Sequence, residues 1–485
     1  MPPPNLAYAS ARQLARLIKQ RKLGAAELLD FYTERQRRHN PALNAVIATR
    51  LPAARKQAKA LDALTARRGA RLGPLHGVPM TVKESFDVAG LPTTWGNLPL
   101  KGNVAKQHAL AVQRLEAAGA VVMGKTNVPV NLGDWQTFNP IYGTTHNPWD
   151  ATRTPGGSSG GAAAALAAGL TALEIGSDIG ASIRDPAHYC GVYGHKPTFE
   201  IAARNGHGLP GGYAFGDISV IGPMARSAFD LETALQVIAG PDAIDATGWR
   251  LTLPRSPKTR LKDFKVAVML SHPTAEVDEA VQSQIDALAR FLRKQGAKVN
   301  MQARPVDPEL AHKTFIMLLR AATSGQRSDT EFAKLAAQRE AQQGRDDYYA
   351  WHVLANTMPH REWLRWDNQR HRMRLQWAAF LRDYDLLLCP AAATTAFTQN
   401  QVGERWERMI PVNGKPQPTT TQMFWAGYSG MAFLPSTVAP IGIASDGLPV
   451  GVQIIGPQYG DLTCLKFAQL IEREYHAFQP PPGFA

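Results

Sequence analysis

Two segments rich in glycine and serine, and one lysine, are the parts of this 485-residue chain best suited to chemistry. Residues 156–161 read Gly-Gly-Ser-Ser-Gly-Gly, and residues 177–184 read Ser-Asp-Ile-Gly-Ala-Ser-Ile-Arg. A serine hydroxyl becomes a good nucleophile only when a base removes its proton. Lys83 ends the apolar run 77–83, and a lysine buried there can lose its charge because burial disfavours the ammonium form. A second hydroxyl that relays the proton makes a His–Asp pair unnecessary, so the residues predict acyl transfer with a lysine base.

Two short patterns match well-known motifs but lack the structural context that those motifs need. Residues 119–126 fit the phosphate-binding pattern G-x-x-x-x-G-K-[ST], which requires a loop between a strand and a helix. Here the four variable positions are themselves an apolar strand, and residues 127–129 indicate a turn. Residues 156–160 fit the nucleophile elbow G-x-S-x-G, but the preceding residues 148–155 are a polar, proline-bounded loop instead of a strand. The sequence therefore predicts neither a nucleotide site nor such an elbow.

The two Gly/Ser segments, with residues 77–84, 195–198 and 447–453, resemble the motifs of the amidase signature family. The resemblance covers nearly the whole chain and is densest over residues 75–200. It places the family's nucleophile on Ser182, its cis-peptide serine on Ser158 and its catalytic lysine on Lys83. The roles that follow are attack by Ser182, proton relay by Ser158 and proton acceptance by Lys83, with no cofactor and no metal ion.

The residues around the nucleophile are expected to form a tight turn that stabilises developing negative charge. The oxyanion hole is expected from the backbone amides of Ile179, Gly180, Ala181 and Ser182. By resemblance, the residues that brace the turn are Ser159, Asp178 and Arg184. The family usually has glycine where this chain has Ala181, and a methyl group fits there if φ is negative. Further departures at Phe433 and Asp461 are expected to change the shape of the substrate site and not the triad.

The order of the elements predicts an α/β fold, and the resemblance implies a large twisted mixed β-sheet flanked by helices on both faces. Helical spacing of apolar residues predicts two helices within residues 10–40 and one over 108–118. Apolar runs predict strands near 77–83 and 120–123, and residues 262–302 predict a strand, a helix and a strand. Such alternation is typical of sheets covered by helices. We expect one domain over residues 1–485, with its catalytic core at 68–200.

Residues 307–382 are predicted to be a helical insertion that covers the substrate pocket. This stretch is charged and rich in aromatic residues, although an ordinary helical surface with its rings facing the core is an equal alternative. The rim of the pocket is expected to use aromatic residues elsewhere in the chain: Trp135, Phe138, Tyr142, Trp425 and Phe433. We expect at least two of these rings above Ser182, where they would favour aryl groups.

Composition and charge restrict the setting in which the protein works. The net charge is +13, but residues 1–80 hold 15 Lys/Arg and 4 Asp/Glu, so the rest of the chain is almost neutral. A basic face could attract nucleic acid or an anionic membrane, yet a solvated helix surface is the simpler interpretation. The three separated cysteines predict neither a disulfide framework nor a zinc site. We expect a cytoplasmic monomer or homodimer that binds neither nucleic acid nor membranes.

The expected activity is hydrolysis of C–N bonds in neutral, apolar or aryl carboxamides, with esters and carbamates or urethanes left open. One alternative is the glutaminase subunit of a tRNA-dependent amidotransferase, which would have to grip free glutamine and bind a partner subunit. A second alternative, from a different class, is a binding protein without catalytic activity. The complete set of one lysine and two serines favours an enzyme over this second alternative.

Overall fold

The protein is built on a mixed sheet of eight strands, described here from a computed structural model that covers residues 5–484. The order across the sheet is β10-β9-β11-β15-β14-β7-β8-β6. Strands β9, β10 and β11 pair in parallel, and the other neighbours pair antiparallel. The strand bounds are β6 Glu174–Asp178, β7 Tyr193–Lys196, β8 Val220–Ala225, β9 Lys265–Val268, β10 Lys298–Asn300, β11 Leu386–Pro390, β14 Ser436–Ile443 and β15 Pro449–Ile455. Helices flank this sheet, which confirms the predicted fold class.

A second, smaller sheet lies beside β6 and carries the predicted catalytic lysine. It has the order β1-β3-β2, with β2 parallel and β1 antiparallel to β3. Its strands are β1 Val46–Thr49, β2 Pro79–Lys83 and β3 Val121–Thr126, and its neighbouring helices are α1 Ala11–Lys19, α2 Ala25–Leu43, α3 Leu51–Ala66 and α4 Leu110–Ala117. Lys125 of the apparent phosphate-binding pattern is buried inside β3, and no helix follows directly, so that segment cannot cradle a phosphate.

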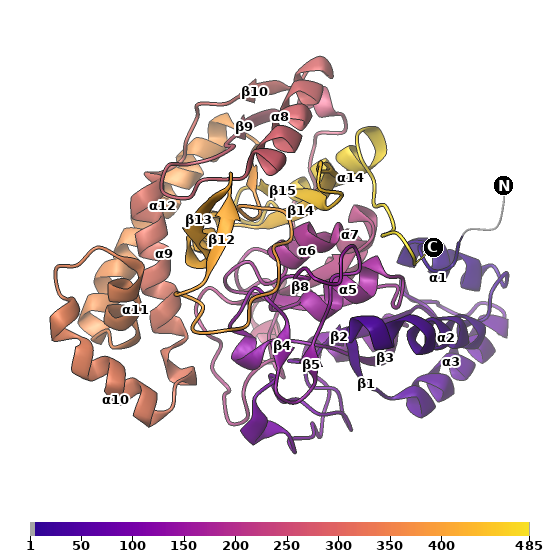
Figure 1. Cartoon of the computed structure of the whole chain (residues 1–485). Helices are drawn as coiled ribbons and strands as arrows, with labels where there is room; N and C mark the ends of the chain where they lie inside the picture. The colour runs from indigo at the N-terminus through magenta and orange to yellow at the C-terminus, as the bar shows by residue number, and fades with distance from the viewer. Residues whose placement is uncertain (1–4, 485) are drawn as a thin grey trace.

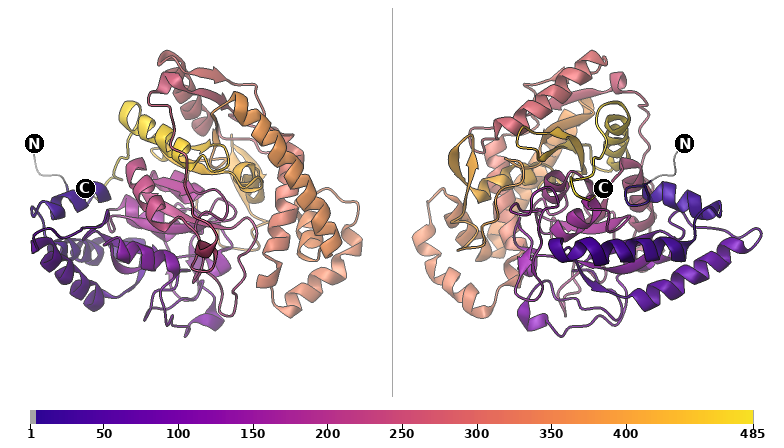
Figure 2. Two further views of the ribbon diagram at one scale, coloured as in Figure 1. Left: turned by 180° about the vertical axis from the view of Figure 1, so that it is seen from behind. Right: turned by 45° about the vertical axis from the view of Figure 1, so that its right-hand side comes forward.

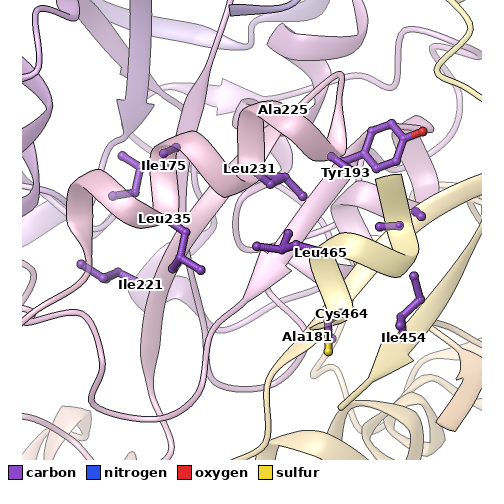
Figure 3. Packing of buried hydrophobic residues seen from close by; sticks show 14 of the residues in the cluster. Ile175, Ala181, Tyr193, Ile221, Ala225, Leu231, Leu235, Ile454, Cys464 and Leu465 are labelled. Atoms are coloured by element: carbon purple, nitrogen blue, oxygen red, sulfur yellow. The ribbon is translucent and has the colours of Figure 1, made fainter. Parts of the chain in front are cut away.

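Helices α5 Gly160–Ala167, α6 Arg184–Cys190, α7 Ala228–Ile238, α8 Glu279–Lys294, α13 Met423–Gly430 and α14 Asp461–Glu474 supply most of the remaining core. Burial of apolar side chains is the main force that holds such layers together. Figure 3 shows one part of this core, where Leu231 and Leu235 of α7 lie near Leu465 of α14 and near Ile175 and Ile221 from β6 and β8. The predicted strand–helix–strand unit at residues 262–302 is present as β9, α8 and β10.

The stretch at 307–382 is helical, as predicted. It folds into α9 Pro308–Ala322, α10 Asp329–Gln338, α11 Tyr348–Asn356 and α12 His360–Asp383, and Figures 1 and 2 show these helices together on one side of the molecule. Asp307, Ser328 and Asp347 cap three of them with side-chain hydrogen bonds to backbone amides, which explains where these helices begin. Two short hairpins complete the elements, β4 Phe138–Asn139 with β5 Gly143–Thr144 and β12 Met409–Val412 with β13 Lys415–Pro418.

The two ends of the described chain lie close together (Figure 1). The carbonyl of Phe484 accepts hydrogen bonds from the Tyr8 hydroxyl at 2.6 Å and from the Arg35 guanidinium at 2.7 Å. Arg35 also donates to the carbonyls of Ala168 and Gly169, so part of the basic N-terminal charge has a structural role. Between residues 5 and 484, every helix is too short or too polar to cross a lipid bilayer.

Candidate active site

Lys83, the last residue of β2, is fully enclosed by the protein. Its Nζ atom donates to Ser158 Oγ at 2.6 Å, to Ser177 Oγ at 3.0 Å and to the Ser177 carbonyl at 3.4 Å. Burial lowers the pKa of Lys83 to about 7, although nearby carboxyl groups, led by Asp178, oppose this effect. Near neutral pH a large fraction of this lysine is therefore uncharged and able to accept a proton.

Ser158 lies in the loop that precedes α5, with no strand leading into it. The peptide bond between Gly157 and Ser158 is cis, as the resemblance implied. The next residue ties this loop to the second Gly/Ser segment, because the amide of Ser159 donates to the carbonyl of Ser182 at 3.0 Å. The two serines proposed for catalysis therefore lie on two loops that are bonded directly to each other.

The turn between β6 and α6 is held by the carboxylate of Asp178. This carboxylate accepts hydrogen bonds from the amides of Ala181 and Ile183, both at 3.0 Å. It also accepts from Nη2 and Nε along one edge of the Arg184 guanidinium, at 2.8 and 3.0 Å. Burial opposes ionisation of Asp178, but Arg184, with Lys196 and the Ile183 amide, outweighs it and the pKa lies below the usual range. Arg184 continues to the carbonyl of Ala426, linking the turn to α13.

The backbone of this turn differs from the expectation in two details. Ala181 has a φ of 76°, so the condition under which its methyl group was expected to fit without cost, a negative φ, is not met. The cause is the Asp178 carboxylate, which fixes the amides on both sides of Ser182 and forces the left-handed conformation that glycine adopts at lower cost. Because the amide of Ala181 is already bound, the free donors of the proposed oxyanion hole are the amides of Ile179, Gly180 and Ser182, which bond to no other backbone group within residues 5–484.

Ser182 is the first residue of the predicted relay but is not bonded to the second. Its side chain makes no hydrogen bond with any residue between 5 and 484, whereas Ser158 and Lys83 are already in contact. Ser182 is 6% exposed, against 1% for Ser158 and 0% for Lys83, so it is the outermost of the three. Catalytic hydrogen bonds commonly shorten only when substrate is bound. Of the predicted hydrogen-bonded chain, the link between Ser158 and Lys83 is thus present and the link between Ser182 and Ser158 is not.

Three side chains from outside the Gly/Ser segments lie next to the turn. Trp135, one of the predicted pocket residues, donates from Nε1 to the carbonyl of Gly180 at 2.8 Å. Met423 at the start of α13 and Leu319 of α9 lie within 4 Å of the position that a β-carbon on Gly180 would occupy. The walls nearest to the turn are therefore mainly apolar, and α9 reaches them.

The other four predicted pocket residues are not seen in contact with the turn. Phe138 is half-buried below the guanidinium of Arg408, and Tyr142 is half-buried between β4 and β5. Trp425 has no exposed surface and packs edge-to-face on Phe424, so it belongs to the core and not to an open cavity. Phe433 stacks on Phe199 with ring centres 4.4 Å apart.

Two residues next to the triad were given no role by the sequence analysis. Ser177 contacts Lys83 through both its hydroxyl and its carbonyl, and its only sequence signal is its place at the start of the second Gly/Ser segment. Asp185 is 2% exposed, and its carboxyl oxygens make no hydrogen bond within residues 5–484. Burial, and then the charge of Asp178, raise the pKa of Asp185 well above its usual range. The sequence signal that could have found Asp185 was an acidic residue directly after Arg184, the last residue of the second Gly/Ser segment.

Comparison with known proteins identifies the family of this chain. The family model described as Amidase matches residues 27–465. The chain is 31% identical to an acylamidase of Rhodococcus erythropolis, with 96% of each chain covered, and 30% identical to a subunit of the glutamyl-tRNA(Gln) amidotransferase of Anaeromyxobacter dehalogenans, with 99% of each covered. A solved bacterial aryl acylamidase of the amidase signature family has a TM-score of 0.79 at 25% identity, covering 96% of both chains. The chain belongs to the amidase signature family and is an amidase, an enzyme that acts on C–N bonds.

Proposed function

We propose that this amidase hydrolyses apolar or aryl carboxamides through an acyl-enzyme on Ser182. The observation that carries the proposal is the 2.6 Å hydrogen bond between Lys83 and Ser158 in a fully buried environment, where the pKa of the lysine is lowered to about 7. A neutral amine at this position can accept a proton from Ser158 while Ser158 takes one from Ser182. The end of strand β2 and two separate loops meet there, which supports a shared chemical role.

In the first half of the reaction, Ser182 Oγ attacks the carbonyl carbon, and its proton passes through Ser158 to Lys83. The carbonyl oxygen gains negative charge, which the free amides of Ile179, Gly180 and Ser182 would stabilise. The C–N bond then breaks as Lys83 returns the proton, through Ser158, to the leaving nitrogen. In the second half, water attacks the ester on Ser182 and gives its proton to the same relay, releasing the acid and restoring the serine.

The apolar surroundings of the turn support a substrate with an apolar or aryl group near the reacting carbonyl. Trp135, Leu319 and Met423 lie next to Gly180, and a flat ring gains dispersion and stacking energy from such neighbours. Esters and carbamates react by the same steps, so they belong to the proposed range.

We propose that the protein works in the cytoplasm as a monomer or homodimer, in agreement with three cysteines that are all free and buried.

A fluorophosphonate probe and a substrate panel test this proposal. The probe should label the wild-type protein and fail to label Ser182→Ala. The panel should contain anilides, aliphatic amides, carbamates and glutamine, and we expect the highest kcat/KM for an anilide. The second candidate, a glutaminase subunit, is favoured by the 30% identity to the amidotransferase protein over 99% of both chains. Glutamine as the preferred substrate would reject the aryl-amidase proposal in favour of that candidate.

A further inference from the structure

Arg320 of α9 is a buried cation without a carboxylate partner. Its side chain is 3% exposed, its Nη2 atom donates to the Tyr348 hydroxyl at 2.6 Å, and its Nε atom makes no hydrogen bond within residues 5–484. No salt bridge joins it to an acid in the same range of residues. Buried charges are normally paired, since removing a charge from water costs several kcal/mol. An unpaired guanidinium at this position therefore suggests that its counter-ion comes from outside the protein.

Two further arginines lie close enough to Arg320 to act on its charge, and we call these three residues the arginine cluster: Arg320, Arg327 and Arg405. Arg327 donates to Asn356 at 3.1 Å and contacts a ring nitrogen of His352 at 3.4 Å. Burial, and then the charge of Arg405, lower the pKa values of Arg320 and Arg327. Burial and the three arginines also lower the pKa of His352, so this ring is neutral.

The acids near the arginine cluster do not neutralise it. Glu331 and Glu404 favour the charged form of Arg327, but neither forms a salt bridge with the cluster within residues 5–484, and Glu331 is engaged by the amide and hydroxyl of Ser328 at the start of α10. The neighbouring Arg408 provides a contrast, because it pairs directly with Asp134 at 2.7 Å. The same part of the molecule thus contains one arginine that is paired by the protein and three that are not.

The arginine cluster adjoins the catalytic turn through two separate connections. Arg320 follows Leu319, whose side chain comes within 3.9 Å of a β-carbon position on Gly180. Arg405 donates to the carbonyl of Gly133, two residues before Trp135, which in turn bonds to the carbonyl of Gly180. The arginine cluster therefore lies on the same segments that form the apolar wall beside the catalytic turn.

We propose that the arginine cluster binds a carboxylate at the far end of the substrate. The inference rests on the proposed amidase function. It narrows the substrate class from neutral carboxamides to apolar or aryl amides that carry one anionic end. Guanidinium groups bind carboxylates through paired, charge-assisted hydrogen bonds, and the free Nε of Arg320 is one donor suited to this geometry. The Tyr348 hydroxyl, which accepts from Arg320, can donate its own proton to the same group.

Matched pairs of anilides test the inference. Glutaric acid monoanilide is compared with an anilide that carries an isopropyl group in place of the carboxylate, which places the charge on the acyl side. Para-acetamidobenzoate is compared with para-isopropylacetanilide, which places it on the leaving group. In at least one pair, we expect the kcat/KM of the carboxylate compound to be at least about tenfold higher than that of its neutral partner. One charge-assisted hydrogen bond provides a difference of this size.

Variants of the cluster should remove this preference without removing hydrolysis of the neutral anilide. Arg320→Gln and Arg405→Gln are each expected to reduce the preference about tenfold, and Arg320→Lys should retain part of it because the charge remains. Arg405 is half-buried, so its variant carries the test if Arg320→Gln does not fold. Arg365→Gln, at an exposed position on α12, is the matched control and should leave the preference unchanged.

Binding to the Ser182→Ala protein provides a measurement that does not depend on turnover. Isothermal titration should show tighter binding of the carboxylate member of the same pair, and Arg405→Gln should abolish the difference. Equal affinities and equal kcat/KM values in both pairs would overturn the inference while leaving the proposed amidase function intact. A protein that hydrolyses no anilide and resists the fluorophosphonate probe would reject the proposed function, and the titration would then decide the inference alone.

Discussion

The charge of Lys83 controls the proposed reaction, because only the neutral amine accepts a proton. Burial lowers its pKa to about 7, so the lysine is uncharged above that pH and protonated below it. We expect kcat/KM to be level in alkaline solution and to fall about tenfold for each unit of pH below about 7. A pH–rate profile measured on a neutral anilide checks this, and activity that stays level down to pH of about 5 would exclude Lys83 as the base.

Ser177 provides a second variant for the same measurement. Its hydroxyl accepts a hydrogen bond from Lys83 at 3.0 Å, and such a contact favours the charged form of the amine. Ser177→Ala should therefore lower the pKa of Lys83 and move the acidic limb of the profile to lower pH. A variant whose limb stays in place would show that Ser177 only fills space.

Ala181 is a position where a smaller residue should stabilise the fold. Its φ of 76° is costly for a residue with a β-carbon, so Ala181→Gly is expected to raise the free energy of unfolding by up to about 1 kcal/mol. The same substitution at Ala163, inside α5, should have the opposite sign, since glycine is unfavourable in a helix. Urea unfolding of the two variants gives the comparison, and a loss of stability in both would contradict the explanation.

The turn between β6 and α6 shows how one buried ion pair can fix a whole element. Asp178→Asn would leave Arg184 buried without its carboxylate, which is expected to cost about 3–5 kcal/mol of stability and most of the activity. Asp263→Asn, which breaks the solvent-exposed pair with Arg260, is the matched control and should change neither. Unfolding curves and kcat/KM for both variants test this, and a stable, active Asp178→Asn protein would be inconsistent with the proposed role of the pair.

The sequence was sufficient to predict the elements whose side chains have a regular pattern. The helices within residues 10–40, the strand that ends at Lys83 and the strand–helix–strand unit after residue 262 were all predicted from apolar spacing. The φ of Ala181 could not be predicted, because it depends on amides held by Asp178. Likewise, the burial of Trp425 depends on how α13 packs against distant elements, which a single sequence does not reveal.

For the molecule as a whole, the sheet order makes the last strands structurally central. Strands β15 and β14, from residues 436–455, lie between β11 and β7 in the middle of the eight-stranded sheet. A chain that ends at residue 430 would leave the inner edges of β11 and β7 without partners, and exposed edges of this kind promote aggregation. We expect the truncated chain to be recovered only as insoluble or aggregated protein, as checked by sedimentation. A soluble monomer of this length would show that the two half-sheets fold separately.

The same central position of β14 and β15 determines the order of events during synthesis. The ribosome synthesises the chain from its N-terminus. Strands β6, β7 and β8 therefore emerge more than 200 residues before β14, the strand that pairs with β7. The nascent protein therefore spends about half of its translation time with an open sheet edge and an apolar interior that is only partly covered. Such a chain is a natural client for chaperones that bind nascent polypeptides, and its yield should depend on the rate of translation as well as on the stability of the finished enzyme.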